Sequence, residues 1–221
     1  MEIVSSGTKK SAKANAMGLG SALFVAVYVP AFLAAALVRT RIELAMALVI
    51  AISLLTAILM MFLFARTRSG FAEFGFRRAS SRYVGFALAS GLTLGLFTAF
   101  LNHLFPLKPP IDVSGFVPWK IGLYFIVGAS VQEEVIFRGL IQSKVHERWT
   151  ASFRIRSTSI SGAVVFTAAL FGVVHLEVGV AVALSAVILG LLAGELRRRS
   201  GSLLPAIVVH SLFNFVDAVW H

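Results

Sequence analysis

Long apolar runs are the feature that most constrains the fold of this 221-residue chain. Seven such runs cover approximately residues 17–38, 44–64, 83–105, 119–142, 159–176, 178–196 and 202–220. An α-helix rises 1.5 Å per residue, so about 20 residues cross a hydrocarbon core about 30 Å thick. Hydrophobic residues make up 58% of the chain and charged residues 14%, well below the charged share of a soluble domain. The sequence therefore predicts an all-α, polytopic transmembrane helical bundle of about seven spans.

The basic residues are concentrated in alternate loops of this predicted bundle. Fifteen of the 20 lysines and arginines fall in one set of loops and four in the other, with Arg138 inside a span. The positive-inside rule places the basic loops, and with them the N-terminus, in the cytoplasm. A basic face beside anionic lipid accounts for the net charge of +10, so we expect the lipid bilayer and no nucleic acid as a partner.

The domain organisation predicted from composition is simple. Residues 1–16 are polar, small and basic, and we expect a disordered cytoplasmic tail there. Residues 17–221 contain no internal repeat and no soluble domain, which indicates a single membrane-embedded domain. The stretch from Lys144 to Arg156 is expected to extend the fourth span as an amphipathic helix. The chain has no cysteine, which excludes disulfides, thiolate metal sites and cysteine nucleophiles.

The fourth span contains Glu133, Glu134 and Arg138, away from its ends. Each such residue costs several kcal/mol inside a membrane, so it normally faces the protein interior and has a function. Glu134 and Arg138 have the i,i+4 spacing of a same-face ion pair. Glu133 points about 100° away and has no partner on its own helix, as suits a general acid or base. The alternative is a charge cluster at the cytoplasmic end of the span that reaches to water.

Two later spans carry further polar side chains. The fifth ends at His175, and the seventh places His210 and Asn214 on one helical face by their i,i+4 spacing. Alone, His175 could be structural and Asn214 could join two helices. Because one pocket would satisfy these groups together with Glu133, we expect a shared catalytic or transport site. The drawn boundaries put His175 roughly 10 Å deeper than Glu133, which requires staggered helices or a later start of the fifth span.

The chemistry that these residues suit best is hydrolysis inside the membrane. A hydrolase needs a base to activate water and donors for the oxyanion that forms at the attacked carbonyl. Glu133 can act as the base, His175 can hold the water, and His210 with Asn214 can donate to the oxyanion. No H-E-x-x-H motif and no pair of buried aspartates is present. A serine mechanism at Ser130 would leave the charged residues of the fourth span unexplained.

These residues resemble the three motifs of the CAAX protease and bacteriocin-processing (CPBP, or Abi) family. The matching elements are Glu133-Glu134-x-x-x-Arg138, Phe171-x-x-x-His175 and His210-x-x-x-Asn214, within roughly residues 119–216. The resemblance implies a membrane-embedded CAAX prenyl protease-like endopeptidase with Glu133, His175, His210 and Asn214 as catalytic residues. It implies supporting roles for Glu134, Arg138 and Phe171.

The resemblance also bears on cofactor, substrate and location. The family has been described both as metalloproteases and as glutamate proteases that need no metal. Glu133, His175 and His210 could bind a divalent metal such as zinc. We expect no cofactor, because asparagine is a poor zinc ligand and a free Glu133 can then act as the base. The expected partner is a membrane-anchored protein or peptide substrate, and the expected location is the bacterial plasma (inner) membrane.

Two other functions remain open from the sequence. A non-proteolytic member of the same family could act as an immunity or scaffolding protein and still keep the motifs. A small ion-coupled transporter could use the same buried carboxylates, although no inverted repeat supports it.

Overall fold

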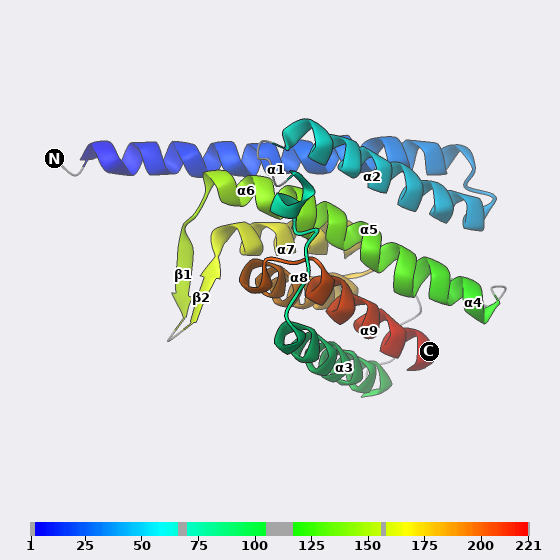
Figure 1. The fold of residues 1–221 in the computed structure, drawn as a ribbon. Helices are drawn as coiled ribbons and strands as arrows, with labels where there is room; N and C mark the ends of the chain where they lie inside the picture. Colours follow the sequence, from blue (N-terminus) through cyan, green and yellow to red (C-terminus); the bar gives the residue numbers. More distant parts are fainter. Residues whose placement is uncertain (1–2, 66–69, 105–116, 156–157, 221) are drawn as a thin grey trace.

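The computed structural model describes residues 3–65, 70–104, 117–155 and 158–220, and these are overwhelmingly helical (Figure 1). The long helices are α1 (Ile3–Leu37), α2 (Ile42–Phe64), α3 (Ser81–Leu104), α7 (Gly162–Val174), α8 (Val180–Ser200) and α9 (Leu204–Trp220). Short 3₁₀ turns occupy Gly70–Phe74 and His175–Glu177. Together with the helical segment from Pro118 to Arg148, this arrangement confirms the predicted all-α bundle.

The segment from Pro118 to Arg148 is continuous but changes its winding along its length. It consists of α4 (Pro118–Ile121), a π-helical stretch (Gly122–Ala129), α5 (Ser130–Glu134), a second π-helical stretch (Val135–Ile141) and α6 (Gln142–Arg148). The i→i+5 turns of a π-helix are rare and are found frequently at functional sites. Glu133 and Glu134 end α5, and Arg138 lies in the second π-helical stretch that follows it.

The N-terminal region differs from the prediction of a disordered tail. Helix α1 begins at Ile3, so the boundary drawn at residue 17 falls inside a helix. Ala16 is fully buried, and the Lys13 ammonium lies 5.0 Å from the centroid of the Trp149 ring. The alanines of this stretch are strong helix formers, and these contacts hold the helix against α6.

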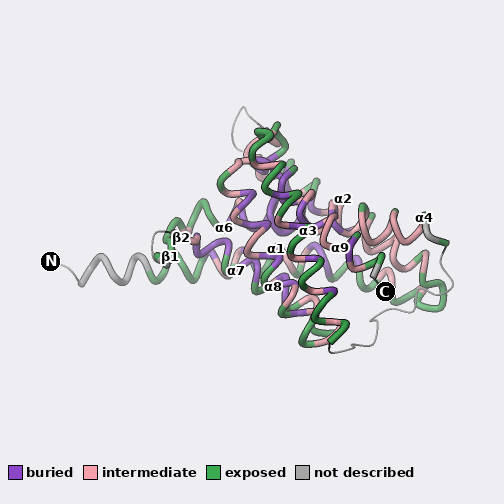
Figure 2. The backbone as a smooth tube through the Cα atoms, turned by 90° about the horizontal axis from the view of Figure 1, so that it is seen from below, coloured by how far each residue is buried: buried purple, intermediate pink, exposed green. Residues whose placement is uncertain are grey.

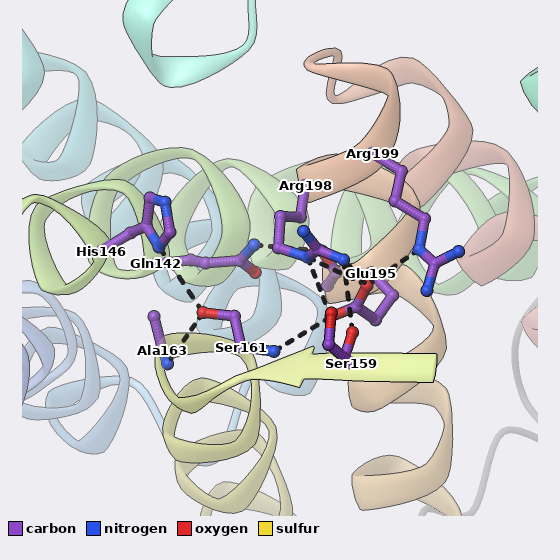
Figure 3. A network of polar contacts seen from close by, with 9 residues as sticks. Gln142, His146, Ser159, Ser161, Ala163, Glu195, Arg198 and Arg199 are labelled. Atoms are coloured by element: carbon purple, nitrogen blue, oxygen red, sulfur yellow. Dashed lines mark hydrogen bonds and ion pairs between the residues drawn. The ribbon is translucent and has the colours of Figure 1, made fainter. Parts of the chain in front are cut away.

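The stretch after α6 also differs from the prediction, because the helix ends at Arg148. It is followed by an antiparallel hairpin of β1 (Ser152–Ile155) and β2 (Thr158–Ser161). Figure 3 shows how Glu195 of α8 holds this hairpin: it accepts hydrogen bonds from Arg198, Arg199 and the backbone N–H of Ser161. The Ser161 hydroxyl in turn caps α7 by accepting from the Ala163 N–H at 3.3 Å. The hairpin therefore delays the start of α7 to Gly162.

The helix from Pro118 to Arg148 occupies the middle of the molecule. The α1–α2 pair packs on one side of it, and α7, α8 and α9 pack on the other, with α3 lying along α9 (Figure 1). Buried residues are concentrated where these layers meet (Figure 2). Close packing of α3 on α9 depends on Gly91, where an added Cβ would lie 2.8 Å from the Val209 carbonyl oxygen.

The loop before α3 fixes the start of α9. The Arg77 Nε donates to the Gly201 carbonyl at 2.6 Å, and the Leu203 N–H donates to the Gly75 carbonyl at 2.9 Å. Gly75 and Gly201 both have positive φ, at 96° and 69°, which only glycine adopts without strain. Helix α9 and its His210 are thereby anchored to a loop that lies 124 or more residues earlier in the chain.

The outer surface of the bundle is strongly apolar. Side chains such as Leu33, Leu55, Phe62 and Leu184, all within long helices, are more than half exposed. Within the described residues, four helices are long and apolar enough to cross a membrane, and Gly162–Glu177 and Leu204–Val219 are shorter apolar helices. A surface of this kind suits contact with lipid, so the chain is an integral membrane protein. The number of spans and the side of the N-terminus stay predictions.

Candidate active site

Two adjacent glutamates of α5 meet one histidine of α9. The His210 Nδ1 lies 2.9 Å from the Glu134 Oε1, and its Nε2 lies 3.6 Å from the Glu133 Oε2. A carboxylate accepts hydrogen bonds, so the Nδ1 carries a proton and donates it to Glu134. This bond fixes the ring so that the Nε2 faces Glu133. The structure thus brings together two of the motifs predicted from the sequence.

The Glu134–Arg138 ion pair predicted from the i,i+4 spacing is confirmed. The Arg138 Nη1 lies 3.0 Å from the Glu134 Oε1, and both side chains are fully buried. None of the guanidinium nitrogens has its N–H aligned for a hydrogen bond to a described residue, so the attraction is one of charge at close range. The same Glu134 oxygen therefore serves both Arg138 and His210, and Glu134 is committed to its neighbours.

Glu133 has a different environment from Glu134. Its side chain keeps 16% of its surface exposed, whereas that of Glu134 keeps none. Among the described residues it faces the His210 ring, at 3.6 Å, which is longer than a good hydrogen bond. The prediction that spacing separates a supporting glutamate from an available one agrees with this geometry.

Phe171 of α7 connects the three motifs through its ring. The ring centroid lies 4.6 Å from that of His175 and 5.6 Å from that of His210, both edge to face. The Arg138 guanidinium carbon lies 4.6 Å from the centroid of the same ring. A cation over an aromatic face is attracted by the ring quadrupole, which helps to hold a buried guanidinium. Phe171 is therefore a packing centre for Arg138, His175 and His210.

His175 reaches this group at the end of α7. Because α7 begins at Gly162 rather than near residue 159, His175 lies closer to the level of the glutamates than the sequence boundaries implied. Its Nδ1 lies 2.8 Å from the carbonyl oxygen of Phe171, one turn earlier. The carbonyl accepts, so the Nδ1 bears the proton and the Nε2 of the neutral ring is an acceptor. Among the described residues, no hydrogen bond joins His175 to Glu133.

Asn214 lies one turn beyond His210 but contacts a different part of the protein. Its side-chain amide nitrogen donates to the Phe125 carbonyl at 2.9 Å and to the Ser130 hydroxyl at 3.1 Å. A carbonyl inside a π-helical stretch is open to an outside donor, because the regular i→i+4 pattern is broken there. Asn214 thus holds the π-helical stretch Gly122–Ala129 and the start of α5 in place. It shares no hydrogen-bond partner with His210.

The fit of a metal ion can be tested on the ligand groups. In the described parts of the chain, no three histidine, aspartate or glutamate side chains come together as a metal site would require. Glu133 and His210 face each other, but the Nδ1 protons of both histidines are directed to protein oxygens. The arrangement of Glu133, His175 and His210 in this structure does not fit a metal centre, and no chemical step is derived through one.

Comparison with known proteins identifies the part of the chain that contains these motifs. Residues 115–216 match the sequence model of one family, described as type II CAAX prenyl endopeptidase Rce1-like. This segment, which is less than half of the chain, is similar to the Rce1-like family. The predicted resemblance to the CPBP proteases is confirmed, and the family is one of peptidases. No curated protein and no solved structure matches the chain.

The Rce1-like match leaves out α1, α2 and α3, yet two of these helices contribute polar contacts to the site. Gln132, directly before the two glutamates, donates to the Tyr28 hydroxyl of α1 at 3.3 Å and to the Ser53 hydroxyl of α2 at 2.9 Å. The sequence reasoning did not find these residues. The available signal was weak, since a tyrosine, a serine and a glutamine inside apolar runs are common in membrane helices.

Proposed function

We propose that this chain is an intramembrane endopeptidase that hydrolyses a peptide bond of a membrane-associated substrate, with Glu133 as the residue that activates water. The observation that supports this most is that the two glutamates differ in their partners and in their exposure. Arg138 and His210 both engage Glu134, so Glu133 is left partly exposed beside the His210 ring. A general base must be reachable by the water it deprotonates, and Glu133 meets that condition.

The proposed reaction balances with the residues at hand. Glu133 removes a proton from water, and the resulting hydroxide adds to the carbonyl carbon of the scissile bond. The protonated Glu133 then gives its proton to the departing amine nitrogen as the carbon–nitrogen bond breaks. The His175 Nε2, an acceptor because the Nδ1 donates to Phe171, suits the holding of the water. His210 is the proposed donor to the oxyanion through its Nε2, which carries a proton only in the doubly protonated ring because the Nδ1 already donates to Glu134.

The proposed oxyanion role of Asn214 needs one change in the site. Its amide nitrogen donates to Phe125 and Ser130, so a substrate carbonyl would have to displace one of these acceptors. The contacts support a second role for Asn214 in the free protein, which is to hold the π-helical stretch Gly122–Ala129 against α9.

We propose further that the reaction needs no metal ion. The ligand geometry described above supports this scheme, and Glu133 is then free to act as a base. Cleavage that persists after exhaustive chelation is the expected result. Loss of cleavage on chelation, with recovery on addition of zinc, would overturn the metal-free scheme and leave the peptidase assignment standing.

The substrate class follows from the family and the surface. Type II CAAX prenyl endopeptidases act in membranes, and the short loops and apolar exterior of this chain suit a substrate that is itself anchored in lipid. We propose a membrane-anchored protein or peptide as the substrate, and the bacterial plasma membrane as the location. Separation of membranes followed by detection of the tagged protein tests the location.

The experiment that tests the function compares cells that express the wild-type chain with cells that express Glu133→Gln. Quantitative mapping of protein termini should reveal at least one membrane-anchored protein that is cut only with the wild type. Glu195→Gln is the matched control, because it removes a glutamate charge outside the site. An immunity or scaffolding protein would retain its biological activity in Glu133→Gln, and a transporter would show ion-coupled flux in liposomes without peptide products. Either outcome would overturn the proposal.

A further inference from the structure

The two glutamates of the candidate site lie on a short piece of α-helix between two irregular stretches. Helix α5 (Ser130–Glu134) has five residues, with π-helical turns before it at Gly122–Ala129 and after it at Val135–Ile141. A π-helical turn contains more residues than the 3.6 of an α-helical turn, so it changes the rotational phase of the residues that follow. The rotation of α5 about its axis therefore depends on its contacts with neighbouring helices.

One face of α5 is held by α9. The Ser130 hydroxyl accepts from the Asn214 amide at 3.1 Å, and the Glu134 Oε1 lies 2.9 Å from the His210 Nδ1. Ser130 and Glu134 are four residues apart, so they lie on the same face of the helix. Successive residues of an α-helix point about 100° apart, which directs Gln132 to nearly the opposite side.

Gln132 holds this opposite side against the first two helices. Its side chain is buried, and its Nε2 donates to the Ser53 hydroxyl at 2.9 Å and to the Tyr28 hydroxyl at 3.3 Å. Both acceptors are buried as well. The Ser53 hydroxyl donates its own proton to the Val49 carbonyl at 2.5 Å, so it meets Gln132 with a lone pair. Helix α5 is thus held from two opposite sides.

Glu133 lies on the flank between these two held faces, at about 100° from Gln132. Its carboxyl group faces the His210 Nε2 at 3.6 Å, so a small rotation of α5 would change this distance. We propose that Gln132 is a positioning residue for Glu133, because its two hydrogen bonds set the rotation of α5 that directs the carboxyl group to His210. This inference rests on the proposed function, since it concerns the orientation of the proposed base. It gives α1 and α2, which lie outside the matched residues 115–216, a task in the site.

A second buried glutamine in the same continuous helical segment provides the matched control. Gln142 is 5% exposed, against 3% for Gln132, and its Nε2 donates to the Gly194 carbonyl of α8 at 3.0 Å. It begins α6, beyond the second π-helical stretch. Gln132→Leu and Gln142→Leu each remove one buried amide donor and keep a side chain of similar size. A purely structural loss should affect both variants alike, whereas a loss of positioning should affect only the first.

The test that needs no substrate observes His210 directly. The full-length protein, labelled with ¹⁵N-histidine and held in lipid nanodiscs, gives signals from five histidines, and those of His210 are absent from His210→Gln. Both ring nitrogens of His210 face glutamates of α5, so a rotation of α5 should shift their signals. We expect a shift in Gln132→Leu and none in Gln142→Leu. Signals that stay in place in both variants, or that shift equally in both, would refute the proposal.

A milder variant keeps the test decisive where Gln132→Leu fails to fold. Ser53→Ala removes the shorter of the two hydrogen bonds of Gln132 and leaves the glutamine in place. It should shift the His210 signals in the same direction as Gln132→Leu, by a smaller amount. Unmoved signals in Ser53→Ala would count against the proposal.

Kinetics provide the second measurement once a cleaved peptide is in hand. Gln132→Leu should lower kcat about tenfold and leave KM within twofold, since a displaced base slows the chemical step without weakening substrate binding. Gln142→Leu should change both constants less than twofold. An equal fall of kcat in the two variants would refute the positioning role. Unmoved His210 signals reject this inference alone, whereas a wild-type protein that cleaves nothing rejects the peptidase proposal, so the two failures are distinguishable.

Discussion

Two glutamate–arginine clusters in this protein have nearly the same composition and very different surroundings. In the first, Glu134 and Arg138 are fully buried in the centre of the bundle. In the second, Glu195 pairs with Arg198 and Arg199, whose side chains are 31% and 46% exposed, at the cytoplasmic end predicted for α8. Both clusters use i,i+3 or i,i+4 spacing within one helix. Sequence spacing alone therefore does not distinguish an ion pair that only stabilises the fold from one that belongs to an active site.

The difference lies in what each cluster holds. In the Glu195 cluster the charges pair with one another, and the cluster also holds the β1–β2 hairpin. Glu195 accepts from the Ser161 N–H, and Arg198 donates to the Ser159 carbonyl (Figure 3). The buried pair instead orients His210, which faces Glu133. A buried charge without its partner is very costly, whereas an exposed pair contributes little. We therefore expect substitutions in the first cluster to act on stability and activity together, and those in the second to act weakly and locally.

The largest expected effect comes from removing one arginine from each cluster. Arg138→Ala should lower the free energy of unfolding by about 3–5 kcal/mol, because it leaves Glu134 buried without a countercharge. Arg198→Ala should cost less than about 1 kcal/mol, since Arg199 still pairs with Glu195. Unfolding by heat in a mild detergent measures both. Equal melting temperatures for the two variants would show that burial does not separate the clusters.

A pair of glycines on α8 sharpens the same comparison. A Cβ at Gly190 would lie 3.1 Å from the Arg138 Nη2 and 3.0 Å from the Ala168 Cα, whereas one at Gly194 would meet Val164 and Gln142. Both Gly→Ala variants crowd a tight contact and should cost about 1–3 kcal/mol of stability. Peptide cleavage should fall about tenfold more in Gly190→Ala, because only this substitution displaces Arg138. Equal loss of cleavage in both would mean that Arg138 is not held through Gly190.

Asn214 offers a prediction of intermediate size. Asn214→Ala leaves the Phe125 carbonyl and the Ser130 hydroxyl without their donor, at a cost of about 1–3 kcal/mol. The hairpin counterpart is Ser161→Ala, which removes the cap of α7 and should cost about 1 kcal/mol. Hydrogen exchange read by mass spectrometry should show faster exchange over Gly122–Ala129 in Asn214→Ala and over the start of α7 in Ser161→Ala. Unchanged exchange over Gly122–Ala129 would refute the anchoring role of Asn214.

The smallest expected effect is that of Glu195→Gln. A neutral amide can still accept from Ser161 and the arginines, so stability should change by less than about 1 kcal/mol. Cleavage should stay within twofold of the wild type. Limited proteolysis should cut the hairpin faster, because its fastening is weaker. A loss of cleavage comparable to that of a substitution at the buried pair would show that the hairpin cluster belongs to the active site.

The sequence predicted the helical bundle and the motif residues because both depend on short-range patterns. Apolar run length sets the helices, and the i,i+4 spacing sets the Glu134–Arg138 pair, which the structure confirms. The family match over residues 115–216 confirms the resemblance based on the three motifs. The roles assigned to Glu133, His175, His210 and Asn214 stay predictions.

What the sequence did not predict depends on tertiary contacts. The helical start of α1 over the basic N-terminal residues is supported by Trp149, which lies more than 130 residues away from Lys13. The hairpin depends on Glu195 of a later helix, and the π-helical stretches carry no composition signal. The separation of Asn214 from His210 arises because the Phe125 carbonyl becomes available within such a stretch. Each of these features depends on a contact between segments far apart in the sequence, and such a contact leaves no local sequence pattern.

The most direct test of the account is the cleavage rate of purified protein in lipid nanodiscs, measured on a peptide from the terminus mapping or on a prenylated CAAX peptide. The account predicts that Glu133→Gln lowers the rate by a factor of about 10³ or more, as expected for loss of a general base, with an unchanged melting temperature. Glu195→Gln should remain within twofold of the wild type. A Glu133→Gln protein that cleaves the peptide at the wild-type rate would contradict the central claim.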